Sequence, residues 1–313
     1  MLVNFKNAAR LDAAEQVYFT RELERIIEEN YPTEYPDYNC RALIPTDFSD
    51  GAGTKKITYR MYDKVGTAKI INSYANDFEA VDVKFTEYSS TVKPLGNKYG
   101  YTVQEARESR QANKPLEQFR AEAARQAIQA EEHFIALFGN DDYGILGLFT
   151  NPNVPTMTFT ADGTGASTLW SNKNSEQILR DLNDLTWAAY YATKGKRVSD
   201  TILLPHGHYA KIATTPFNGT LSSASILDTF LKMNPQVKQV LGMWELDHTH
   251  NTRILADFAF AYQKNPSIVS LRIPVDFEQF VIDKGIETEV KCHETMGGVL
   301  NIYPLASCYA EGL

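Results

Sequence analysis

Apolar side chains recur along the chain with two different periods, and these periods predict the main helices and strands. The clearest helical period spans residues 114–138, where a proline follows Lys114 and a glycine stands at position 139. Proline is favoured in the first helical turn and glycine just after the last, so we expect the helix to begin and end at these points. The expected apolar stripe consists of Leu116, Phe119, Ala123, Ala127, Ala130, Phe134 and Leu137. Such a helix is about 36 Å long, enough to cross a sheet.

The first part of the chain, residues 1–49, predicts an arm that carries one helix. Asp12 and Glu15 have the spacing of a capping box, and Phe19 and Leu23 follow on one helical face. Prolines then recur without an apolar period as far as residue 45, which predicts an extended segment. An extended arm needs another surface to hold its shape.

Residues 50–100 alternate in the manner of β-strands and predict a long two-stranded ribbon, clearest from Ile57 to Met61. The two limbs differ in charge, because Lys and Arg dominate residues 51–70 whereas Asp and Glu dominate residues 71–90. A two-stranded ribbon is only marginally stable in water. It therefore needs a partner surface, either on its own domain or on a neighbouring chain.

A third pattern, over residues 174–262, predicts a separate α/β module. Asn174 and Gln177 have capping-box spacing at the start of a helix, and residues 201–204 form a short apolar run typical of a buried strand. Residues 263–313 consist almost entirely of strand patterns. We expect these late strands to return to the domain of the long helix, which otherwise lacks a sheet to cover. The fold class is therefore α+β.

Composition narrows the class of protein. Of the 313 residues, 43% are hydrophobic and 22% are charged, which is typical of an ordered globular protein. The formal net charge of −8 argues against non-specific binding of nucleic acid or anionic membranes over the whole surface. No apolar run approaches the ~18 residues of a membrane span, and no secretory signal pattern stands at the start. The 17 Tyr and 16 Phe favour large protein contact surfaces.

Candidate metal ligands are few and do not converge in the sequence. Asp247, His248 and His250 supply ligand types for zinc or iron, but no further ligand follows with a spacing such as HExxH. An exposed turn between strands is the favoured interpretation of this segment. His206 and His208 are isolated in the same way.

Other candidate chemistry is equally weak. Residues 163–167 are rich in glycine but lack the Lys-Ser/Thr ending of a phosphate loop, and no GxSxG elbow occurs. Cys40, Cys292 and Cys308 have no paired spacing and are expected to be reduced core thiols. We therefore predict no catalytic residue, no cofactor and no bound metal.

The order of these parts, together with several phrases of the sequence, resembles a tailed-phage major capsid protein of the HK97-like fold. The phrases are AEQVYFTRELERI, ITYRMYDKVGTAKII, KPLEQFRAEAARQAI, FGNDDYGILGLFTNPNVPT, DTILLPHGHYAKIATTP and KCHETMGGVLNIYPLASCYAEG. They are similar to a branch of phage and prophage capsid proteins over almost the whole chain. Their colinear order is the most specific part of the resemblance.

The resemblance implies a division of the chain into an N-terminal arm (1–49), an extended β-ribbon loop (50–100), a peripheral domain (101–173) with its spine helix (114–138), an axial domain (174–262) and returning strands of the peripheral domain (263–313). It implies that copies of the chain form pentamers and hexamers. Further implied partners are separate scaffolding, portal and decoration proteins and packaged double-stranded DNA without sequence-specific contacts, with no membrane. The implied location is the virion capsid, assembled in the bacterial host cytoplasm.

The leading hypothesis is a structural protein, not an enzyme, that self-assembles into an icosahedral phage head around double-stranded DNA. One alternative is an encapsulin-like nanocompartment shell, which uses the same fold to enclose proteins. A second alternative is a metal-dependent enzyme built on Asp247, His248 and His250. The candidate subunit-contact residues are Lys55, Lys56, Tyr59, Arg60, Tyr62, Tyr74, Asp77, Phe78, Glu79, Phe19 and Leu23.

Overall fold

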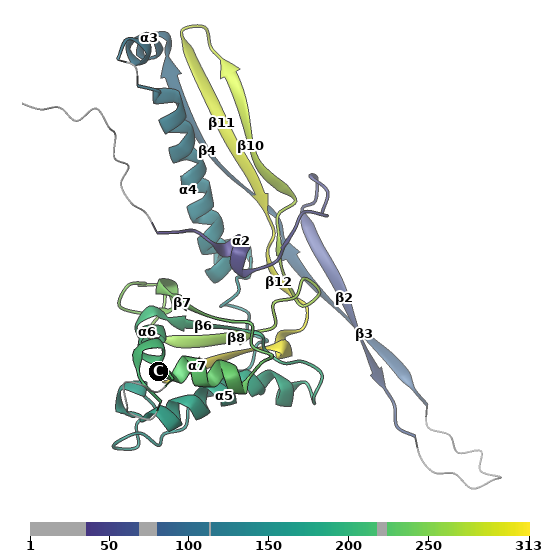
Figure 1. Cartoon of the computed structure of the whole chain (residues 1–313). Coiled ribbons are helices and arrows are strands. Elements are labelled where there is room, and N and C mark those ends of the chain that lie inside the picture. Colours follow the sequence, from purple (N-terminus) through teal and green to yellow (C-terminus); the bar gives the residue numbers. More distant parts are fainter. Residues whose placement is uncertain (1–35, 69–79, 113, 218–223) are drawn as a thin grey trace, which may run out of the picture. The chain divides into compact units, whose positions relative to one another are not determined.

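The computed structural model describes residues 36–68, 80–112, 114–217 and 224–313. The α-helices of this part are α2 (Cys40–Leu43), α3 (Val103–Gln111), α4 (Leu116–Phe138), α5 (Ser175–Ala192), α6 (His206–Thr214) and α7 (Ile226–Met233). Its strands form four sheets (Figure 1). The mixture of helices and sheets confirms the expected α+β class. Among these residues no helix is long and apolar enough to cross a membrane.

Helix α4 packs along a three-stranded antiparallel sheet of order β10-β11-β4 (Figure 1). Its strands are β4 (Lys93–Thr102), β10 (Val275–Asp283) and β11 (Glu287–Met296). Ala124, Ile128, Val290 and Cys292 form a small core between helix and sheet. The Asn97 side-chain amide also donates a 2.7 Å hydrogen bond to the Ala124 carbonyl. The late strands β10 and β11 therefore do lie with the long helix.

The buried face of α4 differs from the expected stripe, although the helix bounds agree closely with the prediction. Ala124 and Ile128 are buried, whereas Ala123 and Ala127 are exposed. A shift of one residue turns a helix face by about 100°. The buried face also includes Glu132, a charged residue that a search for apolar periodicity passes over. The expected stripe is therefore wrong at Phe119, Ala123 and Ala127, which are exposed, whereas its member Leu137 is buried as expected.

A five-stranded sheet of order β5-β13-β8-β6-β7 forms a second core. Its strands are β5 (Thr156–Thr158), β6 (Thr201–Pro205), β7 (Gln239–Met243), β8 (Phe258–Tyr262) and β13 (Ser307–Glu311). Helices α5 and α6 pack on this sheet, and α7 packs on both helices. Asn174 and Gln177 form the predicted capping box at the start of α5. Trp170, Leu182 and Phe230 are fully buried in this core.

Three segments differ from the sequence-based expectation. Strand β13 pairs with β5 and β8, so the last strand joins the five-stranded sheet instead of the sheet beside α4. Strand β4 pairs with β11 and does not continue the ribbon. Residues 40–43 form the helical turn α2 inside the segment expected to be extended. Strand alternation fixes which face of a strand is apolar but does not choose its neighbour, which explains the first two differences.

The two remaining sheets connect the ribbon to the rest of the chain. A small sheet of order β1-β9-β12 consists of β1 (Thr46–Asp47), β9 (Val269–Arg272) and β12 (Gly298–Asn301). The ribbon consists of β2 (Lys56–Val65) and β3 (Asp82–Thr91), paired antiparallel. Gly298 has a φ of 72°, and a Cβ at this position would lie 2.4 Å from Ile145 Cγ2. Glycine is therefore required where β12 begins, against Ile145 and Leu146.

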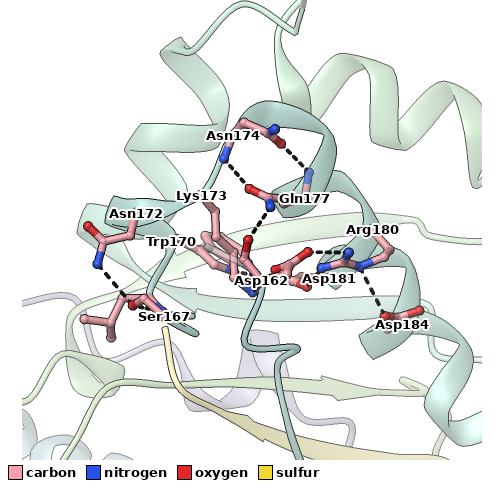
Figure 2. A network of polar contacts seen from close by, with 11 residues as sticks. Asp162, Ser167, Trp170, Asn172, Lys173, Asn174, Gln177, Arg180, Asp181 and Asp184 are labelled. Carbon is pink, nitrogen blue, oxygen red and sulfur yellow. Dashed lines mark hydrogen bonds and ion pairs between the residues drawn. The ribbon is translucent and has the colours of Figure 1, made fainter. Parts of the chain in front are cut away.

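A buried polar network fastens the loop before α5 to that helix (Figure 2). Lys173 Nζ lies 2.6 Å from Asp181 Oδ2, and both side chains are fully buried. Trp170 Nε1 donates a 3.1 Å hydrogen bond to the same oxygen. Arg180 bridges Asp162 and Asp181 at 2.5 and 3.1 Å. Because the members of the network satisfy one another's charges, the loop is fixed without an external ligand.

The glycine-rich loop at residues 163–167 uses its backbone donors internally. The Gly163 N–H bonds to the Ser167 carbonyl, and the Thr164 N–H bonds to the Asn172 carbonyl. Figure 2 shows that Ser167 also lies beside Asn172, whose side-chain amide donates to its hydroxyl. These two backbone N–H groups are therefore not directed at a phosphate site.

Candidate assembly surfaces

The ribbon β2–β3 has two different faces, because residues opposite one another in an antiparallel pair point to the same side. One face carries Tyr59 opposite Tyr88. The other face carries Tyr62 opposite Phe85. The surroundings of these two aromatic pairs show which part of the ribbon is supported by its own chain.

The first face attaches the root of the ribbon to strand β12. Tyr59 and Tyr88 stack with ring centroids 5.4 Å apart. The Tyr59 hydroxyl donates a 3.4 Å hydrogen bond to the Asn301 carbonyl, and burial raises the pKa of this phenol, which keeps the donor protonated. The Ser90 hydroxyl donates a 2.8 Å hydrogen bond to the Gly297 carbonyl. The root is therefore held by its own chain.

The second face carries a group of exposed apolar side chains beside the charged side chains of Arg60, Lys64 and Glu87. Tyr62 is 64% exposed and Phe85 is 69% exposed, with their ring centroids 6.4 Å apart. Val83 lies opposite Lys64 on the same face and is 41% exposed. We call Tyr62, Val83 and Phe85 the ribbon patch. Large apolar side chains gathered on an exposed surface mark a site of protein interaction.

The opposed charges of the two limbs neutralise one another within the ribbon. Arg60 Nε lies 2.6 Å from Glu87 Oε1. Asp63 stands opposite Lys84 in the strand register. Exposed ion pairs of this kind contribute about 0–1 kcal/mol. At these positions the charged side chains of one limb therefore pair with those of the other limb. They contribute little electrostatic attraction toward a neighbouring chain.

The structure places only part of the candidate contact residues. Lys55 and Lys56 are exposed at the root, Tyr59 is half-buried, Arg60 is paired within the ribbon and Tyr62 belongs to the ribbon patch. The other candidates, Tyr74, Asp77, Phe78, Glu79, Phe19 and Leu23, lie outside the described residues.

Sequence reasoning missed Val83 and Phe85 as contact residues. Both lie in the stretch predicted as a ribbon, but the register that brings them to the face of Tyr62 is set by the pairing of β2 with β3. The alternation of Val83 and Phe85 was the available signal. This alternation indicates a common face with Tyr62 only once the pairing register of the two strands is known.

A second group of exposed apolar side chains lies at the turn between β10 and β11. Val281 is 69% exposed, Ile286 is 82% exposed and Phe280 is 53% exposed. Gly285 closes this turn with a φ of 89°. The sequence pattern predicted the strands but not that their far end lacks cover. This turn is a second candidate surface for contact between copies.

The histidine candidates come closer together than the sequence indicates. His248 Nδ1 lies 2.6 Å from Asp257 Oδ1, and His208 Nε2 lies 3.4 Å from the other oxygen of that carboxylate. Asp247, His248 and Asp257 offer ligand atoms within 4.8 Å of one another. However, ligands of tetrahedral zinc stand about 3.4 Å apart, whereas 2.6 Å is the length of a hydrogen bond. His250 bonds separately to Asp247 at 2.9 Å.

This histidine cluster therefore serves to fasten a loop. It joins the exposed turn at residues 247–250 to Asp257 and to α6, and the bond to Asp257 raises the pKa of His248. Hydrogen bonds from Thr249 and His250 lower the pKa of Asp247 to about 2, despite an opposing effect of burial. The expected exposed turn is confirmed, and its polar groups are engaged with one another.

The three cysteines are buried free thiols, as expected. Burial raises the pKa of Cys40, of Cys292 and of Cys308, the last to about 11. The thiolate is the reactive form of cysteine, so these side chains are suited to packing and not to nucleophilic chemistry.

Known proteins resemble this chain in sequence family and in fold. The family model described as major capsid protein matches residues 66–313. No curated protein matches the chain. A structure described as the capsid of Myoviridae phage XM1 has a TM-score of 0.80 and 17% identity, covering 96% of this chain and 100% of its own.

Two further structures share the fold at lower similarity. A chain from Mycobacterium phage Ogopogo has a TM-score of 0.61 and 11% identity, covering 94% of this chain and 99% of its own. A virus-like particle from Pyrococcus furiosus has a TM-score of 0.51 and 12% identity, covering 86% and 90%. The shared architecture is the HK97-like capsid fold. Because the family model spans one limb of the ribbon, the long helix and both larger sheets, the chain belongs to the major capsid protein family of structural shell proteins.

Proposed function

We propose that copies of this chain self-assemble into an icosahedral phage head that encloses double-stranded DNA. Family membership supports a structural role in the virion capsid. The observation that carries the proposal is the ribbon patch, in which Tyr62, Val83 and Phe85 are exposed to water while the opposite face is anchored at its root. In an isolated chain Tyr62 contacts Phe85 and its ring centroid lies 6.0 Å from Lys64 Nζ, but both aromatic side chains stay largely exposed.

A second copy of the chain is the partner that best fits the ribbon patch. Burying apolar surface stabilises a contact by roughly 25 cal/mol per Å², and a two-stranded ribbon is marginal until it packs on another surface. Lys55 and Lys56 at the root and the β10–β11 turn extend the proposed contact area. Arg60 contributes through its pairing with Glu87, which keeps the ribbon in register.

The proposal includes the arrangement and partners of the shell. The chain forms pentamers and hexamers, with the module around the five-stranded sheet as axial domain and α4 as spine of the peripheral domain. Separate scaffolding, portal and decoration proteins complete the head, which is assembled in the cytoplasm of a bacterial host. The net charge of −8 supports enclosure of DNA without sequence-specific contacts and without a membrane partner. The chain has no catalytic role, cofactor or resident metal in this proposal.

The test is assembly of a variant in which Tyr62→Ser and Phe85→Ser remove the aromatic part of the ribbon patch. We expect a folded, unassembled subunit, because both side chains are exposed in the single chain and contribute to burial only between copies. Size-exclusion chromatography with light scattering measures the mass, and electron microscopy shows whether shells form.

A matched control removes one tyrosine and one phenylalanine elsewhere, Tyr143→Ser and Phe48→Ser, which are 55% and 49% exposed. This control should still form shells. Normal shells from the ribbon-patch variant would contradict the proposed role of the patch. Failure of the unmodified protein to form any particle would contradict the proposed function itself.

A shell that encloses proteins is the second candidate, supported by the likeness to the virus-like particle from Pyrococcus furiosus. Both candidates predict closed particles, so mass does not separate them. Nuclease treatment and analysis of the contents of purified particles do. Double-stranded DNA inside supports the phage head, whereas a defined protein content supports the compartment.

A further inference from the structure

Arg41 joins three carboxyl groups that come from three different elements. Its Nε lies 2.7 Å from Glu132 Oε1 and its Nη2 lies 2.9 Å from Glu132 Oε2, a two-pronged contact with α4. The same Nη2 lies 3.1 Å from Glu294 Oε1 on β11. Nη1 lies 2.9 Å from Asp276 Oδ1 on β10. A single side chain thus attaches the short helix α2 to the helix and sheet beside it.

The charges of this cluster do not balance when all of its groups are ionised. Glu132 and Glu294 are 2% and 1% exposed at their side chains, whereas Asp276 is 58% exposed. One guanidinium then faces two buried carboxylates and a third at the surface. Burying an excess of negative charge is costly because the ions lose their hydration.

One oxygen of Glu294 shows where the excess charge is relieved. Its Oε1 accepts from Arg41, but its Oε2 is buried without a hydrogen-bond partner. An unpaired buried carboxylate oxygen is unfavourable, whereas a protonated one donates to a neighbouring acceptor. Glu132 is the acceptor beside it. A proton on Glu294 therefore satisfies the orphan oxygen and removes one buried charge.

The proton affinity of Glu294 agrees with this geometry. Burial and the negative charge of Glu132, opposed by Arg41, together raise the pKa of Glu294 from 4.5 to about 8. The groups that face Glu294 are Arg41 on α2, Glu132 on α4 and Asp276 on β10, and the Cys40 thiol donates to Glu132. At neutral pH the Glu294 carboxyl holds a proton in this environment.

We propose that Glu294, Glu132 and Arg41 form a proton-operated latch that holds α2 against α4 and β11. The latch is closed while Glu294 carries its proton and weakens when Glu294 ionises beside Glu132. Glu294 has a higher proton affinity when α2 is attached than when it is free in water. The stabilisation of the attached α2 by this proton is therefore complete below pH 4.5 and is lost as the pH rises through about 8. Any use of the latch to release α2 during shell assembly rests on the proposed function, but the latch itself does not.

Hydrogen exchange of the full-length chain tests the latch. The reporters are the amide groups of Ala42, Leu43 and Ile44, which bond to the Asn39 and Cys40 carbonyls in and just after α2. After correction for the intrinsic exchange rate, the protection of these amides should fall as the pH is raised from 6 to 9. The fall should be at most about tenfold per pH unit below the pKa of Glu294 and should level off above it. Glu294→Gln is neutral at every pH, so its protection should stay level across this range.

The control is Glu289→Gln, on the same strand but paired with Lys284 instead of Arg41. It should keep the pH dependence of the unmodified chain. Unchanged α2 protection in the unmodified chain, or a fall that persists in Glu294→Gln, would overturn the latch. If Glu294→Gln does not fold, infrared spectra of the unmodified chain still decide. A protonated-carboxyl band that titrates near pH 8 supports the latch, and its absence at pH 6 refutes it.

These outcomes separate the latch from the proposed function. Shells that form from a chain without pH-dependent α2 protection refute the latch alone. A chain that shows the latch but never assembles refutes the shell proposal alone.

Discussion

The module around the five-stranded sheet and the ribbon β2–β3 differ in which side chains they bury. In the module, even a lysine and an aspartate are fully buried, because Lys173 and Asp181 pair with each other and with neighbouring groups. In the ribbon, large apolar side chains such as Phe85 stay exposed and ion pairs lie at the surface.

This difference identifies where the chain is complete and where it depends on other molecules. A buried ion pair is tolerated only when its partners are present in the same chain, so the module carries its own stabilisation. The ribbon is held by its own chain at its root, through Tyr59 and Ser90. We therefore expect substitutions in the module to change subunit stability and substitutions in the ribbon patch to change assembly.

The largest effect on stability is expected for Lys173→Met. This change leaves the Asp181 charge buried without its ammonium partner, which costs roughly 3–5 kcal/mol in such pairs. Urea unfolding of the subunit measures the loss. Replacing both residues, with Lys173→Met and Asp181→Leu, should recover much of it, because no unpaired charge remains. An equal loss from Tyr62→Ser in the ribbon patch would contradict the comparison.

A smaller effect is expected where α4 meets its sheet. Ala124→Leu forces additional atoms into the core with Val290 and Cys292, at a cost of about 1–3 kcal/mol. Ala123→Leu, one position earlier, places the same atoms on an exposed face and should change stability by less than about 0.5 kcal/mol. Comparing the free energies of unfolding of the two variants shows which face of α4 is buried. The reverse order of effects would restore the stripe expected from the apolar pattern.

The smallest effect is expected for the surface pair of the ribbon. Arg60→Glu places two acidic groups opposite each other, and we expect a loss of about 0.2–1 kcal/mol that shrinks in 1 M salt, where screening acts within roughly 3 Å. Adding Glu87→Arg should restore the pair. If assembly of Arg60→Glu remains impaired after this exchange, Arg60 also contacts a neighbouring chain.

Local signals in the sequence were sufficient where a residue acts on its own segment. Pro115 and Gly139 marked the ends of α4, and Asn174 with Gln177 marked the start of α5. Asn174 and Gln177 bond to the adjacent backbone, whereas Pro115 and Gly139 act through the backbone angles that they favour. Their effect is therefore independent of what the helix later packs against.

The remaining features depend on partners that are distant in the chain. Arg41 stabilises α2 through Glu132 and Glu294, which lie 91 and 253 positions away. A short helical turn between prolines has no periodic signal of its own, and its partners on α4 and β11 are identified only by the fold. The same limitation explains the missed orientation of α4 and the unexpected neighbour of β13.

The attachment of the ribbon root to β12 has a mechanical consequence. Beyond Tyr59 and its partner Tyr88, the paired strands continue over residues 60–65 and 82–87, or about 20 Å at about 3.3 Å per residue. A rotation of about 10° at this attachment moves the far end of the strands by about 3.5 Å. In the proposed shell, the same ribbon can thus reach neighbouring subunits that are tilted at slightly different angles. The adjustment is confined to a few bonds near Tyr59.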